Sequence, residues 1–382
     1  REGAIAHKAR QSEGEKREMA YLAEQTLSAD YEADTLTLHV SGRADGLFTR
    51  GDGVTVVEEI KLGEKGNPLI PAHRAQAAMY GHMLCTRDGL SGVGLRILYV
   101  DERGEGVACY EEDADAQTLE ETFGKLCAAA CIWEEKMLSR RQERDASLSA
   151  LPFPYDSYRA GQRQFAAGVY VAIRDRKRLF AQAPTGIGKT MAALYPALRA
   201  LGEGKCSRVL YLTARTTGRK SATDALALLE SRGAKLSAVE IAAKDKLCPQ
   251  ERRDCRAEVC PYAEGFYDRL PDAVSEAFSG GIWDRTRIEA LAQKHGICPF
   301  ELALELAQRA DVVVCDYNYV YDPFVSIDAL LTGGAALLVD EAHQLAPRVQ
   351  ESRSAKLSLR ELTETAGKPG RRLGGRATCI AR

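Results

Sequence analysis

The chain has 382 residues, of which 45% are hydrophobic and 28% charged, a composition typical of globular proteins and a length sufficient for two domains. No apolar run approaches the roughly 18–20 residues of a membrane span, so no membrane contact is expected. The net charge of −2 means that any nucleic-acid contact must come from local basic patches. Eleven scattered cysteines are too few for a disulfide scaffold of this length, and a cytoplasmic location is expected.

The first part of the chain is predicted to be an α+β domain spanning residues 1–147. A Gly-Asp-Gly turn at 51–53 is expected to close a hairpin, and Ser, Pro and aromatic residues near 150 mark the end of the domain. The predicted helices are 4–26, 72–86 and 115–143, and the predicted strands are 35–40, 42–48, 54–62, 93–100 and 106–111.

The second part, residues 151–344, is predicted to be an α/β domain with a parallel sheet, because short β-rich runs alternate with helical segments. These runs are RLFAQA (178–183), RVLYLT (208–213), DVVVCD (311–316) and ALLVD (336–340). Residues 345–382 are interpreted as the beginning of a further insertion or as a tail.

The stretch APTGIGKT follows one of these runs and precedes an apolar helix, which is the context of a phosphate-binding loop. Glycines at 186 and 188 allow backbone N–H groups to surround phosphate at a helix N-terminus. Lys189 is expected to reach the β- and γ-phosphates, and Thr190 to bind Mg²⁺. The predicted ATP-binding residues of the loop also include Thr185, Gly186, Ile187 and Gly188.

The second nucleotide motif is DEAH, at the end of the run ALLVD. Its two carboxylates are expected at the carboxyl edge of the sheet, where ligands bind in such folds. Asp340 would hold Mg²⁺, Glu341 would activate the attacking water, and His343 would couple hydrolysis to motion.

With these motifs in this order, the chain resembles superfamily 2 DEAH-box helicases. FPYDSYRAGQRQF (153–165) is similar to the adenine-recognition motif of that group, which implies that Gln162 reads the adenine edge with Tyr155 or Tyr158 packed nearby. YLTARTT (211–217) is similar to the following helicase motif, which implies that Thr213 and Arg215 contact the DNA backbone.

Of the six cysteines between the two nucleotide motifs, four are candidate ligands, namely Cys248, Cys255, Cys260 and Cys298, with the spacing C-x6-C-x4-C-x37-C. Zinc sites favour C-x2-4-C steps, and only the middle step fits that rule, whereas an iron–sulfur cubane tolerates uneven spacing. Zinc and free thiols remain the alternatives. The cysteines and the later VVVCDYNYVYDPF resemble the iron–sulfur helicases of the XPD/DinG type, which implies a structural [4Fe–4S] cluster in an insertion over about 244–302.

In the first domain, Asp45 precedes the predicted hairpin, and Glu59 and Lys61 share one face of its return strand. Glu58 points the other way and is expected at the surface or behind the site. Two acids that hold a divalent metal, with a lysine beside the attacking water, can hydrolyse a phosphodiester. Charged hairpins are common, so a purely structural role is the alternative.

Further residues extend this pattern. Gln76 and Tyr80 lie one helical turn apart in HRAQAAMYGHM, and His7 lies near the start of the chain. Together with the acids they resemble the PD-(D/E)XK nucleases of the RecB and Cas4-like group. The resemblance implies that His7, Asp45 and Glu59 bind Mg²⁺ or Mn²⁺, and that Gln76 and Tyr80 position the active strand.

The combined interpretation is a restriction-endonuclease-like α+β domain followed by a RecA-like motor lobe. It predicts an ATP-dependent DNA helicase for repair or replication that is coupled to a metal-dependent nuclease, acts on single-stranded or forked DNA and, by resemblance, travels 5′ to 3′. A second motor lobe is expected outside these 382 residues. The alternatives are a non-catalytic DNA-binding module with a degenerate nuclease scaffold, and a motor with zinc in place of iron.

Overall fold

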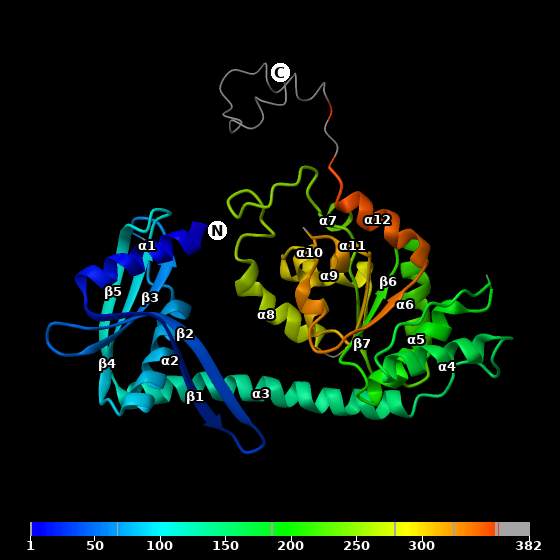
Figure 1. Cartoon of the computed structure of the whole chain (residues 1–382), viewed down its shortest axis with the longest axis horizontal. Helices are drawn as coiled ribbons and strands as arrows, with labels where there is room; N and C mark the ends of the chain where they lie inside the picture. Colours follow the sequence, from blue (N-terminus) through cyan, green and yellow to red (C-terminus); the bar gives the residue numbers. More distant parts are fainter. Residues whose placement is uncertain are drawn as a thin grey trace. The chain divides into compact units, whose positions relative to one another are not determined.

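The computed structural model describes residues 2–66, 68–184, 186–278, 280–323, 325–355 and 358. The chain forms two compact units, the first ending at Arg140 and the second beginning at Arg141 (Figure 1). None of the helices in the described ranges is long and apolar enough to cross a membrane.

The first unit is built on a five-stranded sheet in the order β1-β2-β3-β4-β5. Only the β3–β4 pair is parallel, and the other neighbours run antiparallel. Ala6 of α1 packs against Ile60, Leu98 and Val100, whereas α2 and the start of α3 pack into the larger apolar cluster. The elements are α1 (Glu2–Arg17), β1 (Met19–Glu32), β2 (Thr37–Thr49), β3 (Thr55–Leu62), α2 (Pro71–Asp88), β4 (Gly92–Val100), β5 (Gly106–Asp115) and α3 (Ala116–Ser149).

The start of this unit departs from the sequence prediction. The helix expected over residues 4–26 ends at Arg17, and β1 begins at Met19, because residues 19–32 pair with 37–49 along the whole of β2. The two strands expected at 35–40 and 42–48 are one continuous strand. The glycine-rich hairpin turn is confirmed: Gly53 adopts a φ of +88°, and the Arg50 N–H donates to the Val54 carbonyl oxygen at 2.8 Å.

The second unit contains a parallel five-stranded sheet in the order β10-β6-β9-β7-β8, as the alternating pattern predicts. Apolar side chains of α5 and α6, together with Leu148 near the end of α3, fill its core. The elements are α4 (Gln162–Arg174), α5 (Lys189–Gly202), β6 (Val209–Leu212), α6 (Thr216–Ser231), β7 (Ser237–Glu240), α7 (Lys244–Leu247), α8 (Phe266–Ala277), β8 (Gly281–Trp283), α9 (Arg285–His295), α10 (Pro299–Arg309), β9 (Val312–Cys315), α11 (Asn318–Tyr321), η1 (Asp328–Leu330), β10 (Ala336–Val339), η2 (Ala342–Gln344) and α12 (Leu345–Ser352).

One predicted strand of this unit is wrong. Residues 178–183, the run RLFAQA before the phosphate-binding loop, form no strand, and Phe180 is 91% exposed. A strand needs a hydrogen-bonded neighbour, and in the described ranges no strand pairs with this segment. The short strands β7 and β8 were not expected.

The topology places the functional loops together. Because β6, β7, β9 and β10 are parallel, the segments that follow them leave from the same edge of the sheet. The DEAH residues follow β10, and the segment that carries the first three cysteines leaves after β7 and α7. Tertiary structure therefore brings distant stretches of sequence to one edge.

Candidate functional site

In the first unit, polar contacts join four of the six residues expected in a nuclease centre, and a separate contact joins the other two. Lys61 of β3 lies 2.6 Å from the Glu59 carboxylate and donates to the Gln76 side-chain oxygen at 3.0 Å. The Gln76 amide in turn donates to the Tyr80 hydroxyl at 3.3 Å. Glu59 and Lys61 therefore lie on the same side of β3, facing α2, as the strand spacing predicts.

Asp45 and His7 complete this cluster from β2 and α1. One oxygen of Asp45 accepts the Ile60 N–H at 2.8 Å, and the other lies 3.5 Å from His7 Nδ1. Burial raises the pKa of Asp45, and burial together with the Asp45 charge raises the pKa of Glu59 to about 7. Two carboxylates that disfavour each other's charge are suited to a shared proton or cation.

The burial of the Glu59 carboxylate bears on whether this cluster could hold a divalent cation. Its side chain is 2% exposed, and its Oε2 atom is buried without a hydrogen-bond partner in the part of the chain that the structure describes. A buried charged oxygen without a partner is costly, and a divalent cation would satisfy it. The same described ranges contain no group of three or more His, Cys, Asp or Glu side chains gathered closely enough to hold a metal. The donor types fit Mg²⁺ or Mn²⁺, although the ligand shell is not closed.

Sequence reasoning missed two residues that support this cluster. Gln11 of α1 donates to the Asp45 carbonyl oxygen at 3.0 Å and to Glu24 at 2.9 Å. Glu58, expected at the surface or behind the site, is fully buried and accepts from Arg10 at 3.1 Å. Both contacts attach α1, and with it His7, to the sheet. No local signal distinguishes Gln11 from a surface glutamine.

In the second unit, the phosphate-binding loop enters α5 with Gly186 and Gly188 at φ values of +86° and +81°. A Cβ atom at residue 188 would lie 2.6 Å from the Gln162 amide nitrogen, so both the conformation and the space require glycine. Ile187 packs close to Gly161 beside the same loop. Thr185, predicted to bind ATP, lies outside the described residues.

Gln162, predicted to read adenine, is buried against this loop. Its amide donates to the Gly188 carbonyl oxygen at 3.4 Å, and its oxygen accepts the Arg159 N–H at 3.0 Å. Of the two candidate tyrosines, Tyr158 stacks on Phe153 with ring centroids 3.7 Å apart, while Tyr155 is largely exposed.

The DEAH residues face the start of α5. Lys189 Nζ lies 3.6 Å from one Glu341 oxygen, and His343 Nδ1 lies 3.5 Å from the other. Burial and the Asp340 charge raise the pKa of the Tyr211 hydroxyl, which also hydrogen-bonds to Thr190 and Asp340. Tyr211, in the middle of β6, thus bridges the two residues predicted to hold Mg²⁺. Sequence analysis did not identify this role.

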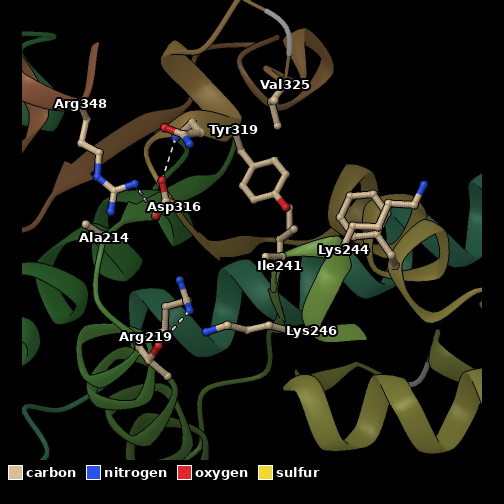
Figure 2. A pocket seen from close by; sticks show the side chains of 13 residues that line it. Ala214, Arg219, Ile241, Lys244, Lys246, Asp316, Tyr319, Val325 and Arg348 are labelled. Carbon is tan, nitrogen blue, oxygen red and sulfur yellow. Dashed lines mark hydrogen bonds and ion pairs between the residues drawn. The ribbon is translucent and has the colours of Figure 1, made fainter. Parts of the chain in front are cut away.

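A cavity of about 500 Å³ opens beside the same sheet edge (Figure 2). Four cationic side chains line it, and Asp316 is its single carboxylate. Arg219 is 7% exposed and lies 3.3 Å from Glu240, while Lys244 lies 5.0 Å above the Phe300 ring. The lining residues are Ala214, Thr216, Arg219, Ile241, Ala243, Lys244, Lys246, Phe300, Asp316, Asn318, Tyr319, Val325 and Arg348.

The two residues predicted to contact DNA lie next to this cavity but differ in accessibility. Arg215 is exposed and stands immediately before α6. Thr213 is 1% exposed, and a Cβ atom at Gly218 would overlap its hydroxyl. The Thr213 side chain is therefore enclosed, in contrast to the expected backbone contact.

The four cysteines expected to hold a cluster lie in one region without forming a ligand shell. Cys255 is exposed, Cys260 is buried, and Cys248 and Cys298 are half-buried. The Cys298 N–H donates to the Tyr262 carbonyl oxygen at 3.2 Å, which fixes the fourth cysteine near the third. Within the described ranges, no three of them form a metal-ligating group, although thiolates are the donors that an iron–sulfur cluster requires.

Two family models match parts of the second unit. Residues 160–256 match the family model "DEAD/DEAH box helicase", and residues 233–362 match the model "DEAD_2". The solved structure of an "XPD_Helicase" aligns with a TM-score of 0.39 at 18% identity, covering 55% of this chain and 37% of that one.

Two relatives are similar over about half of this chain. The helicase subunit XPD of the general transcription and DNA repair factor IIH from Arabidopsis thaliana is 24% identical over 50% of this chain and 30% of that protein. A homologue of the regulator of telomere elongation helicase 1 from Drosophila yakuba is 24% identical over 54% of this chain and 26% of that protein. The chain thus spans less than a third of either relative. Segments of the second unit thus match helicase family models.

Proposed function

We propose that this chain is part of an ATP-dependent DNA helicase, and that its second unit binds and hydrolyses ATP. The convergence of Lys189, Thr190, Asp340 and Glu341 at one sheet edge carries the proposal. These residues come from motifs about 150 positions apart, and the parallel sheet brings them together. The helicase family models that match this unit support the same conclusion.

Each residue has a role that its position allows. The amides of the loop containing Gly186 and Gly188 would surround the phosphates, and Gln162 would contact adenine. Thr190 and Asp340 would hold Mg²⁺, which when bound neutralises phosphate charge. Lys189 would exchange its ion pair with Glu341 for the γ-phosphate. The freed Glu341 carboxylate would then accept the proton of the attacking water.

The cavity beside this centre is suited to a single-stranded DNA backbone. Its cationic side chains are Arg219, Lys244, Lys246 and Arg348. Three of them also form ion pairs, Arg219 with Glu240, Lys244 with Glu301 and Arg348 with Asp316, so DNA phosphates would compete with these carboxylates. Arg215 would add a contact at the rim. Travel from 5′ to 3′ along single-stranded or forked DNA, in repair or replication, is part of the proposal by resemblance to XPD-type helicases.

Nucleotide binding tests this proposal directly. Calorimetry of the chain with ATP and Mg²⁺ should give saturable binding that Lys189→Ala abolishes, because a phosphate would lose its only lysine in the loop. Lys177→Ala removes an exposed lysine before the loop and serves as the control. Equal affinity in the unaltered chain and in Lys189→Ala would refute the assignment. Glu341→Gln should retain binding and lose hydrolysis.

A second candidate function, cleavage of DNA by the first unit, is favoured by the unpartnered Glu59 oxygen. Asp45, Glu59 and His7 would hold Mg²⁺ or Mn²⁺, which when bound lowers the pKa of a water and neutralises phosphate charge. Lys61 would position that water, and Gln76 and Tyr80 would fix the lysine through their hydrogen bonds.

The nuclease proposal is tested on the whole chain without ATP, so that the motor contributes nothing. Single-stranded DNA should be cleaved with Mg²⁺ or Mn²⁺, and Asp45→Ala, Glu59→Ala and Lys61→Ala should each abolish cleavage. Lys65→Ala, an exposed lysine after β3, should leave it intact. If neither metal supports cleavage and calorimetry detects no metal binding, the first unit is a scaffold.

We also propose that the four cysteines hold a [4Fe–4S] cluster, on the grounds of their spacing and their position between the two motifs. Lys244 supports a common location for Cys255 and Cys298: burial lowers the pKa of Lys244, but the hydrogen bond and charge of Glu301 together with the charges of Cys255 and Cys298 raise it overall. Protein purified without oxygen should contain about four irons per chain. Cys255→Ser should lose them, and Cys109→Ser should not. Stoichiometric zinc instead would contradict the proposal.

A further inference from the structure

The turn after β9, residues 316–319, contains a tyrosine that reaches the catalytic segment. Tyr317 is 1% exposed, and its hydroxyl donates to the carbonyl oxygen of Asp340 and lies 3.2 Å from that of Glu341. Burial and the Asp340 charge raise the pKa of Tyr317 to about 12, so the hydroxyl remains a hydrogen-bond donor at neutral pH. A single donor thus holds both carbonyl groups of the proposed catalytic pair.

Glu341 needs such a restraint because its backbone is left-handed, with φ +51° and ψ +46°. An L side chain with a Cβ disfavours this region, and Glu341 is one of four non-glycine residues with positive φ among those described. The conformation directs the carboxylate between Lys189 Nζ at 3.6 Å and His343 Nδ1 at 3.5 Å. With a negative φ at Glu341, the carboxylate would point away from these two side chains.

The same turn forms part of the basic cavity. Asp316, Asn318 and Tyr319 line it, and Asp316 lies 4.0 Å from Arg348 of α12. In Figure 2 the Tyr319 ring stands between the Asp316–Arg348 pair on one side and Lys244 on the other. Within residues 316–319, Asp316, Asn318 and Tyr319 therefore line the cavity, and Tyr317 contacts the DEAH backbone.

We propose that Tyr317 is a positioning residue that holds Glu341 in its left-handed conformation and so links the basic cavity to the hydrolytic carboxylate. This inference rests on the proposed ATPase function of the second unit. Tyr317 contacts neither phosphate nor water in this role. Tyr317 acts through the peptide carbonyl groups of Asp340 and Glu341. The cavity-lining residues on either side of it, Asp316 and Asn318, transmit DNA binding to the turn that contains Tyr317.

The variants Tyr317→Phe and Tyr170→Phe are compared. Each removes one tyrosine hydroxyl from the second unit, but that of Tyr170, on α4, donates to the Glu203 side chain instead of to the DEAH segment. With saturating single-stranded DNA, Tyr317→Phe should lower kcat for ATP by roughly 10- to 100-fold, because misplacing a catalytic group costs rate. Its KM for ATP should change less than threefold. Tyr170→Phe should retain kcat within about threefold.

Crystal structures of the unaltered chain and of Tyr317→Phe give a readout independent of activity. The Glu341 φ should be positive in the first and negative in the second. A positive φ in Tyr317→Phe, or an unchanged kcat, overturns the inference. If the unaltered chain hydrolyses no ATP, the proposed motor function fails, and the Glu341 backbone in the two structures still decides the role of Tyr317.

Discussion

Replacing Glu59 by glutamine should change how the stability of the first unit depends on pH. Burial and the neighbouring Asp45 carboxylate raise the pKa of Glu59 from its ordinary value of 4.5 to about 7. Glutamine has nearly the same shape, stays neutral at every pH and so removes this titration. The comparison isolates one carboxyl group in a unit where burial also raises the pKa of Asp45 and Glu58.

The sign and size follow from linkage between proton binding and folding. Between pH 4.5 and about 7, the folded protein holds a proton on Glu59 that the unfolded chain has released. Stability is therefore highest below pH 4.5 and falls as the pH rises through 7. The difference between the two pKa values corresponds to roughly 3 kcal/mol. The unfolding free energy of Glu59→Gln minus that of the unaltered chain should therefore be about 2–3 kcal/mol larger at pH 8 than at pH 5.

The chain offers a convenient reporter for this measurement, because it has two tryptophans, Trp133 in the first unit and Trp283 in the second. In a Trp283→Phe background, fluorescence during urea unfolding reports the first unit alone. Glu102→Gln, at an exposed glutamate in the β4–β5 turn, is the control and should show no such pH dependence. Metal-free buffer is required, since a bound cation would stabilise the ionised form. An equal stability difference at pH 5 and pH 8 would refute the reasoning.

Two further predictions concern the second unit. Asp311→Asn should destabilise it by about 3–5 kcal/mol in urea unfolding followed by Trp283 fluorescence, because Asp311 pairs with buried Arg144 at 2.8 Å; a loss below 1 kcal/mol would contradict this. Gly188→Ala should weaken ATP binding at least tenfold in calorimetry, because its positive φ and the 2.6 Å approach to Gln162 exclude a Cβ. Gly204→Ala, also at positive φ but with open space around it, should leave ATP affinity unchanged.

Short-range spacing was sufficient to predict much of the candidate sites. The two-residue step from Glu59 to Lys61 and the four-residue step from Gln76 to Tyr80 determine which side chains share a strand face or a helix face. The loop glycines and the DEAH carboxylates are recognisable for the same reason. Each of these features is defined by residues that lie close together in the sequence.

Contacts over long sequence separations could not be predicted in this way. Residues 19–26 form a strand because β2 pairs with them, while 178–183 lack a partner strand and stay irregular within the described ranges. Tyr211 sits in an apolar β-rich run, where an aromatic residue is usual, and Tyr317 directly follows another such run. Only the folded sheet places their hydroxyls beside Asp340 and Glu341.

The order of strands in the second sheet also has a consequence for biosynthesis. Strand β9 lies between β6 and β7, yet it is translated about 70 residues after β7 ends at Glu240. At roughly 5–20 residues per second, several seconds pass on the ribosome before the gap between these strands can be filled. The four candidate cluster cysteines, Cys248, Cys255, Cys260 and Cys298, are translated within that interval, and the β10 segment with its DEAH carboxylates comes later. The thiols of these four cysteines are thus accessible to cellular metal-delivery and redox systems before the second unit can form its nucleotide site.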